Sequence, residues 1–380
     1  MNQTEKRYNR DLACLSHESQ KEEGLMKTKK SLWCTIAVVL LVISFAIPVS
    51  AQPKASSGSA PIKITLASYS PPGAHQQAVE GWAKELEQRS GGRIKVEIAW
   101  GAVMTKPEEH YDLAVNGLAE VALVAPSYTP GRFLMAEVVD LPLAKMTDTV
   151  LTKSYWELFQ RGYFKQDYRD VKVLLLWTTG PCDYMTSKTP VSSFADMKGK
   201  KIRASGAVAV NVVRALGSIP VGMPAPEIYG ALDKGTLDGV LTNWPLVKAY
   251  KTYEVSKYVT GISTTYMAFA MVMNQPFFAK LPEDIKAIVD DLSWKYSLVG
   301  AATQDQWNKD AQEMFKQKGG RMLEFSPADM DRVHEVMAPI WSKWIAEGEA
   351  KGLARKKMVD EFYSILKKNG VEKAYHGYKP

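Results

Sequence analysis

The stretch Lys198-Gly-Lys-Lys-Ile-Arg-Ala-Ser-Gly206 combines a short apolar run with a glycine at which a helical pattern begins. Ile202 lies in the part that predicts a strand, and the helical pattern ends at Gly217. Arg203 is therefore expected where a strand leads into a helix. Its planar guanidinium fits a carboxylate, and the helix start would add free N–H groups. An alternative at this point is that Arg203 is a solvated arginine among the neighbouring lysines.

The segments nearer the N-terminus predict a β-α-β unit. Residues 62–67 alternate between apolar and polar side chains, residues 75–89 form an amphipathic helical pattern, and residues 93–98 alternate again. Such a unit implies a parallel sheet covered by helices.

An internal similarity indicates two such units. Residues 111–124 align without a gap on residues 229–242, and both segments are typical of a helix, a glycine and a strand that enters a loop. Two related α/β lobes would explain the match, although a single chance match would too. Loops beyond the carboxyl ends of the strands would then line a cleft, and Arg203 would be among them.

We therefore predict an α/β protein with a two-lobed periplasmic-binding-protein fold, a ligand cleft between the lobes and a helical C-terminal region. Lobe I is expected over residues 61–176 and lobe II over 177–265. Residues 266–380 should supply a strand that recrosses to lobe I, one long helix and C-terminal helices that return to it.

The first 51 residues predict an export signal. A basic segment at 26–30 precedes an apolar run at 36–47 and a small-residue cleavage site ending at Ala51. Residues 1–25 are expected to be an over-extended start, and 52–60 a flexible lead-in. A retained anchor is the alternative, but the apolar run is shorter than the roughly 20 residues that span a membrane.

Charge and cysteine content exclude some classes of function. The net charge is +7, but the sequence contains no basic stripe with interleaved aromatic residues. Nucleic acid is therefore not an expected partner. Cys182 is the one cysteine after residue 51, which rules out an intrachain disulfide in a processed chain. With no histidine near it in the sequence, Cys182 is expected to be a buried thiol rather than a nucleophile.

The sequence offers no group for catalysis. It contains no nucleophile elbow, zinc-binding H-E-x-x-H, C-x-x-C, phosphate loop or dinucleotide fingerprint. The histidines after residue 51 show no spacing typical of metal ligands; they are His75, His110, His334 and His376. We therefore predict neither an enzyme nor a cofactor, and no motif requires a metal.

Several segments together match a known pattern; they are 194–206, 217–224, 227–232, 237–239, 128–133 with 140–142, and 253–255 with 257–258. With them the chain resembles the DctP-type substrate-binding proteins of TRAP (tripartite ATP-independent periplasmic) transporters. The resemblance covers about residues 60–345.

The resemblance implies a periplasmic receptor, exported by a Sec-type signal, that captures an organic acid between its lobes. It also implies delivery of that acid to a membrane permease driven by an ion gradient. Arg203 matches the arginine with which the family clamps a carboxylate. Lobe closure would be a hinge motion favoured by contacts that the ligand makes only in the closed state.

Two departures from the sialic-acid members of the family point to a different ligand. Lys188-Thr189 stands where those members carry a second arginine, and Thr242 stands where they carry an asparagine. The remaining candidates for ligand contact suggest an aromatic-lined pocket for a monocarboxylate or aromatic acid, with ordinary packing as the alternative; they are Asn243, Trp244, Tyr69, Tyr128 and Tyr184.

Two other hypotheses remain open from the sequence. The protein could present its ligand to a membrane sensor instead of a permease, because the same cleft would serve both. It could also be a secreted enzyme on a bilobed scaffold, which the lack of a catalytic group disfavours. Arg132 is expected to hold its own loop rather than to bind ligand.

Overall fold

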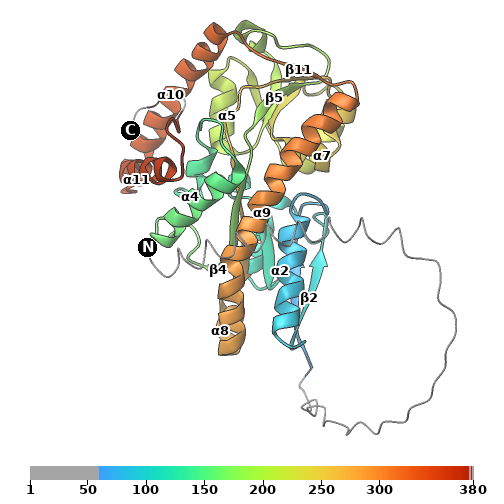
Figure 1. Ribbon diagram of the computed structural model, residues 1–380, viewed down its shortest axis with the longest axis vertical. Coiled ribbons are helices and arrows are strands. Elements are labelled where there is room, and N and C mark those ends of the chain that lie inside the picture. Colours follow the sequence, from blue (N-terminus) through green and yellow to red (C-terminus); the bar gives the residue numbers. More distant parts are fainter. Residues whose placement is uncertain (1–59, 376–377, 379–380) are drawn as a thin grey trace, which may run out of the picture. The chain divides into compact units, whose positions relative to one another are not determined.

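The computed structural model describes residues 60–375 and 378, and these form two mixed β-sheets covered by helices (Figure 1). The predicted export signal, over-extended start and most of the lead-in lie outside the described residues. Over the range that is described, no helix has both the length and the apolar character needed to cross a membrane.

The first sheet has the strand order β2-β1-β3-β10-β4. Strands β1 to β3 run parallel, and β10 pairs antiparallel with both β3 and β4. Its elements, with the helices between them, are β1 (Ile62–Ala67), α2 (Gln76–Arg89), β2 (Ile94–Ala99), α3 (His110–Val115), β3 (Val121–Val124), α4 (Asp148–Gln160), β4 (Val171–Thr179) and β10 (Met267–Asn274).

The second sheet has the order β11-β9-β5-β8-β6-β7. Strands β6, β7 and β8 run parallel, and β5 pairs antiparallel with β8 and β9. Its elements and helices are β5 (Asp183–Thr186), β6 (Lys201–Ala204), α5 (Gly206–Ala215), β7 (Ile219–Gly222), α6 (Ile228–Asp233), β8 (Gly239–Thr242), α7 (Trp244–Ala249), β9 (Tyr258–Thr260) and β11 (Arg321–Leu323).

The two sheets repeat one pattern, which confirms the internal similarity seen in the sequence. The run β1-α2-β2-α3-β3 has its counterpart in β6-α5-β7-α6-β8, and in each sheet an antiparallel strand, β10 or β5, lies beside the third parallel strand. Gly117 and Gly235, with φ of 65° and 70°, occupy equivalent turns after α3 and α6. The fold is thus the expected two-lobed one, with one sheet in each lobe.

The chain passes between the lobes several times. It leaves the first sheet after β4 and returns to it through β10, and the 35-residue helix α9 (Glu283–Gln317) packs on β4, α2 and α4 in one lobe and on α7 in the other. Figure 1 shows α9 in orange running from beside β4 to beside α7 and β11. The short helix α8 (Gln275–Lys280) precedes it.

Two helices form the C-terminal region, α10 (Pro327–Glu349) and α11 (Arg355–Lys368). Between them, Gly352 has φ of 73°, a left-handed conformation that ends the helical run. The side chain of Arg355 lies beside Gly348, where a larger residue would clash with it.

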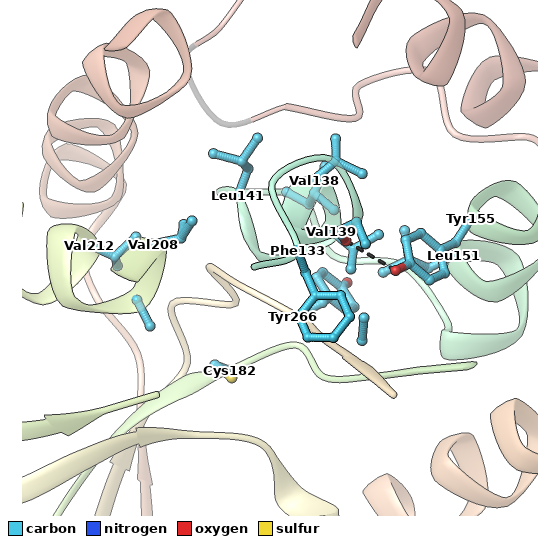
Figure 2. Packing of buried hydrophobic residues seen from close by; sticks show 14 of the residues in the cluster. Phe133, Val138, Val139, Leu141, Leu151, Tyr155, Cys182, Val208, Val212 and Tyr266 are labelled. Atoms are coloured by element: carbon cyan, nitrogen blue, oxygen red, sulfur yellow. Dashed lines mark hydrogen bonds between the residues drawn. The ribbon is translucent and has the colours of Figure 1, made fainter. Parts of the chain in front are cut away.

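The largest apolar core joins the lobes. It includes Val138 and Leu141 of the first lobe together with Val208 and Val212 of α5, which Figure 2 shows on either side of one cluster. Tyr155 donates a hydrogen bond to the carbonyl of Ala136 at 3.1 Å within the same cluster. The lobes are therefore in apolar contact next to the start of α5.

Candidate functional site: a cavity between the lobes

A cavity lies where the carboxyl ends of the parallel strands of both lobes meet. The loops after β1 and β3 reach it from lobe I, and the segment after β8 reaches it from lobe II, as expected for a ligand crevice in α/β proteins. The lining residues are Tyr69, Ser70, Ala74, His75, Tyr128, Thr179, Ala225, Asn243, Pro245, Leu246, Ala249, Tyr250, Met267, Phe269 and Gln304.

Three of the predicted ligand-contact residues line this cavity. Tyr69 follows β1 and Tyr128 follows β3, and their rings lie 5.5 Å apart at an angle of 60°. Asn243 caps α7, with its side-chain oxygen accepting from the backbone N–H of Leu246 at 3.0 Å. Strand-end positions of both lobes thus meet at one place.

Arg203 lies close to the cavity but does not line it. It occupies β6, is 1% exposed, and donates through Nε to the carbonyl of Met223 at 2.9 Å. Its Nη2 is buried and has no hydrogen-bond partner among the described residues. A buried guanidinium with an unused donor is costly unless an anion completes it.

Two tyrosine hydroxyls near Arg203 are also buried without a partner in the described part of the chain, those of Tyr69 and Tyr250. Burial raises the pKa of both phenols well above the ordinary value, and the positive charge of Arg203 opposes that shift in each case. Both groups are therefore protonated and able to donate. Together with Arg203 they form a set of unused donors suited to a carboxylate.

The start of helix α5 adds to this set. Ser205, at its N-cap, makes no side-chain capping bond, so the first N–H groups of the helix stay available. Ser127 of lobe I lies against Gly206, and its hydroxyl is buried without a partner within the described range. A second contact between the lobes is a hydrogen bond in which the hydroxyl of Tyr128 accepts from the N–H of Ala225 at 3.2 Å.

The other three predicted contact residues do not line the cavity. Trp244 donates from its indole to Asp183 at 3.1 Å and packs on Phe315. Tyr184 belongs to the largest apolar core, and its hydroxyl forms a hydrogen bond with that of Ser218 at 2.7 Å. Thr242 is 3% exposed within the β5–β8 pairing. The structure gives each of the three a packing role, which for Tyr184 was the alternative to ligand contact.

Sequence reasoning missed most of the cavity residues, among them His75, Thr179, Tyr250 and Gln304, whose polar groups bear on the site. Gln304 lies within α9 and is fully buried. Its signal in the sequence is a polar residue on the apolar face of a long helical pattern. Tyr250 follows α7 directly and lines the cavity, whereas Trp244, the predicted contact residue of that segment, does not.

Two other expectations concern Arg132 and Cys182. Arg132 pairs with Asp112 at 2.6 Å and lies over the ring of Tyr111, so it holds its loop as expected. Cys182 is buried, and burial raises the pKa of its thiol to about 12, which leaves it unreactive. Across the described residues, no group of three or more His, Cys, Asp or Glu side chains is placed to hold a metal ion.

A cavity between two α/β lobes, bordered by unused donors at strand and helix ends, defines a solute receptor of the bilobed class. The chain belongs to the bacterial extracellular solute-binding proteins of family 7, the DctP family, whose model matches residues 68–347. Members of this family are solute-binding receptors of TRAP transporters, not enzymes.

Solved structures and a curated relative agree with this assignment. A TRAP solute-binding protein specific for aromatic acids, from a marine metagenome and in complex with metahydroxyphenylacetate, is 25% identical with a TM-score of 0.77, over 81% of this chain and 99% of the other. A TRAP protein from Bordetella bronchiseptica with bound mandelate is 25% identical with a TM-score of 0.75, over 81% and 99%. The C4-dicarboxylate-binding periplasmic protein DctP of Rhodobacter capsulatus is 24% identical over 83% of this chain and 93% of its own length.

Proposed function

We propose that this protein captures an aromatic carboxylate in the periplasm and delivers it to a TRAP permease driven by an ion gradient. The observation that carries the proposal is the buried, incompletely bonded guanidinium of Arg203 beside two unpaired phenol hydroxyls. In a cavity of low dielectric constant these donors would hold a carboxylate far more strongly than the same groups in water.

The aromatic part of the proposal rests on the rings that line the cavity. Tyr69, Tyr128, Tyr250 and Phe269 give it apolar walls, which would exclude a strongly hydrated second charge such as that of a dicarboxylate. Two of the similar structures hold aromatic acids, metahydroxyphenylacetate and mandelate. The ligand would therefore place its carboxylate near Arg203 and its ring between the tyrosines.

Membership of the family supports delivery to a permease and residence in the periplasm. The relative in Rhodobacter capsulatus is named a periplasmic binding protein, and the apolar run at residues 36–47 supports export of this chain by a Sec-type signal. The two permease subunits of a TRAP transporter would be the membrane partners.

A thermal-shift screen of the purified protein tests this function. The panel should pair aromatic acids with their uncharged amides, and should include aliphatic dicarboxylates and sugar acids. A ligand present at 100 times its Kd adds about 2.7 kcal/mol to the free energy of unfolding, which raises the melting temperature measurably. Aromatic acids should stabilise the protein and their amides should not. Equal shifts for an acid and its amide, or shifts for dicarboxylates alone, would contradict the proposal.

A further inference from the structure

The cavity has a second set of polar groups, at its lobe I end. It is formed by His75 at the start of α2, Thr179 at the end of β4 and Gln304 in α9, all of which are at most 9% exposed. The ring of His75 lies 4.4 Å from that of Phe269, so an aromatic wall borders this polar group as well. Arg203, by contrast, belongs to β6 of the other lobe.

Backbone contacts fix the orientation of the Gln304 amide. Its Nε2 lies 3.2 Å from the carbonyl of Ala74, which can only accept, so the nitrogen and not the oxygen must face that carbonyl. The amide oxygen then faces Thr179, whose hydroxyl donates to it at 3.1 Å. The hydroxyl proton of Thr179 is thereby used, and its lone pairs remain as acceptors.

The same contacts set the tautomer of His75. Its Nδ1 lies 3.3 Å from the Nε2 of Gln304, which can only donate, so Nδ1 must accept and the ring proton must sit on Nε2. Burial lowers the pKa of His75 to about 4, so the ring is neutral at physiological pH. No described residue offers a hydrogen-bond partner to its Nε2–H.

This end of the cavity therefore presents one unused donor, the Nε2–H of His75, and one acceptor, the hydroxyl oxygen of Thr179. A ligand hydroxyl complements the pair because it accepts one hydrogen bond and donates another. A carbonyl only accepts, and a methyl group or a hydrogen atom would leave both protein groups unpaired in a buried site.

Resting on the function proposed above, we infer that the preferred ligand is an aromatic acid with a ring hydroxyl remote from its carboxylate. In this arrangement Arg203 and the tyrosines hold the carboxylate, and His75 and Thr179 select the hydroxyl. His75 is a specificity-determining residue.

Binding of matched acids to wild type and to His75→Phe tests the inference. Titration calorimetry should compare phenylacetate and benzoate with their 3-hydroxy and 4-hydroxy forms. In wild type at least one hydroxylated acid should bind about fivefold or more tightly than its parent, the range expected for one or two hydrogen bonds in a buried site. His75→Phe keeps a planar ring but lacks Nε2–H, so the ratio of the two affinities should fall to about onefold.

Two further variants complete the design. In His75→Gln the side-chain amide can place a donor near the former Nε2, so part of the preference should return. His334→Phe makes the same substitution in α10 at a residue that does not line the cavity, and it should leave the preference unchanged.

The outcomes separate this inference from the proposed function. If no carboxylate binds wild type, the proposed function fails and the inference fails with it. If acids bind but hydroxylation changes nothing, or His75→Phe keeps the preference, only the inference is overturned. If His75→Phe does not fold, the nitrogen chemical shifts of His75 in wild type decide: protonation of Nδ1 instead of Nε2 would refute it.

Discussion

At the scale of single residues, the most informative group is a charged side chain that the protein itself does not satisfy. Arg203 is almost fully buried, yet its Nη2 has no partner in the described structure, and the hydroxyls of Tyr69 and Tyr250 nearby share this condition. Such groups reduce stability by an amount that a bound anion would recover. The protein is thus less stable than its core allows, in the region where it is expected to bind.

A second residue, Asp167, should shape the pH dependence of stability. Its carboxylate is buried and accepts the backbone N–H groups of Met135 and Ala136 at 2.8 and 2.7 Å. Burial raises its pKa to about 6, from an ordinary value of 3.8, so the folded state binds more protons than the unfolded state between these two pH values. Its contribution to stability is therefore complete below about pH 4 and is lost as the pH rises through about 6.

Replacement of Asp167 by Asn should remove this loss, because the amide oxygen can still accept both N–H groups. Relative to wild type, Asp167→Asn should gain up to about 3 kcal/mol in the free energy of unfolding between pH 4 and pH 7. Urea denaturation across this pH range measures the difference. A gap between the two proteins that is constant with pH would show that Asp167 does not titrate as described.

The matched control is Asp196, which also accepts two backbone N–H groups but lies at the surface. The backbone hydrogen bond from Ser192 is the main cause that lowers the pKa of Asp196. Its contribution is therefore lost as the pH falls, and Asp196→Asn should change the pH profile in the opposite direction.

At the scale of elements, the start of helix α5 joins the two lobes. Gly206 has φ of 80°, and a Cβ there would lie 2.8 Å from both the Cβ and the carbonyl oxygen of Ser127 in the other lobe. Gly217 after the same helix also has φ of 80°, but a Cβ there would meet only the Cα of Lys198, at 3.8 Å. Substitutions at Gly206 and Gly217 would therefore share the backbone strain, and only the one at Gly206 would add a clash between the lobes.

Gly206→Ala should weaken ligand binding by about tenfold, because the new methyl group opposes the close approach of the lobes at a cost of about 1–3 kcal/mol. Gly217→Ala should lower stability by about 1 kcal/mol through its backbone conformation and leave the affinity unchanged. Calorimetric titration and thermal melts of both variants measure the two effects. Equal affinities for the two variants would mean that closure does not depend on this contact.

The elements themselves were largely predictable from the sequence. The alternation over 62–67 gave the bounds of β1, and the match of 111–124 with 229–242 corresponds to α3-β3 and α6-β8, because local apolar periodicity and glycine turns carry this information. The existence of one long helix in the last third of the chain, α9, was also predicted from the sequence. Strand order was not predictable, since the pairing of β10 with β3 and β4 depends on contacts far apart in the sequence.

The site was predictable only in part, and for a physical reason. Positions after β1, β3 and β8 identified Tyr69, Tyr128 and Asn243, because strand ends of parallel sheets converge. The sequence could not show which way Trp244 and Tyr184 point, and both lie in packed environments. His75 and Gln304 are 229 residues apart in the chain, so their contact was visible only in the folded structure.

At the scale of the whole receptor domain, the burial of Arg203 predicts a hinge motion. An acid could reach a side chain that is 1% exposed only if the lobes separated, and the contacts of Ser127 with Gly206 and of Tyr128 with Ala225 would re-form on closure. Helix α9 packs on both lobes and would bend or act as the hinge support during this motion.

Small-angle X-ray scattering should therefore detect closure on binding. The radius of gyration should decrease when a saturating aromatic acid is added, and the decrease should be smaller for Gly206→Ala. An unchanged radius of gyration at saturation would show that the acid enters without movement of the lobes.

The most direct test of the account is the affinity of Arg203→Met for an aromatic acid, measured by calorimetry beside wild type and Arg214→Met. Arg214 is an exposed arginine on α5, so its replacement makes the same change of charge outside the cavity. Arg203→Met should fold with a melting temperature equal to or above that of wild type, because an unpaired buried charge is removed. It should lose about 10- to 150-fold in affinity, the amount expected for a charge-assisted contact, while Arg214→Met binds normally. If Arg203→Met binds the acid as tightly as wild type, Arg203 is not the carboxylate clamp and the central claim is wrong.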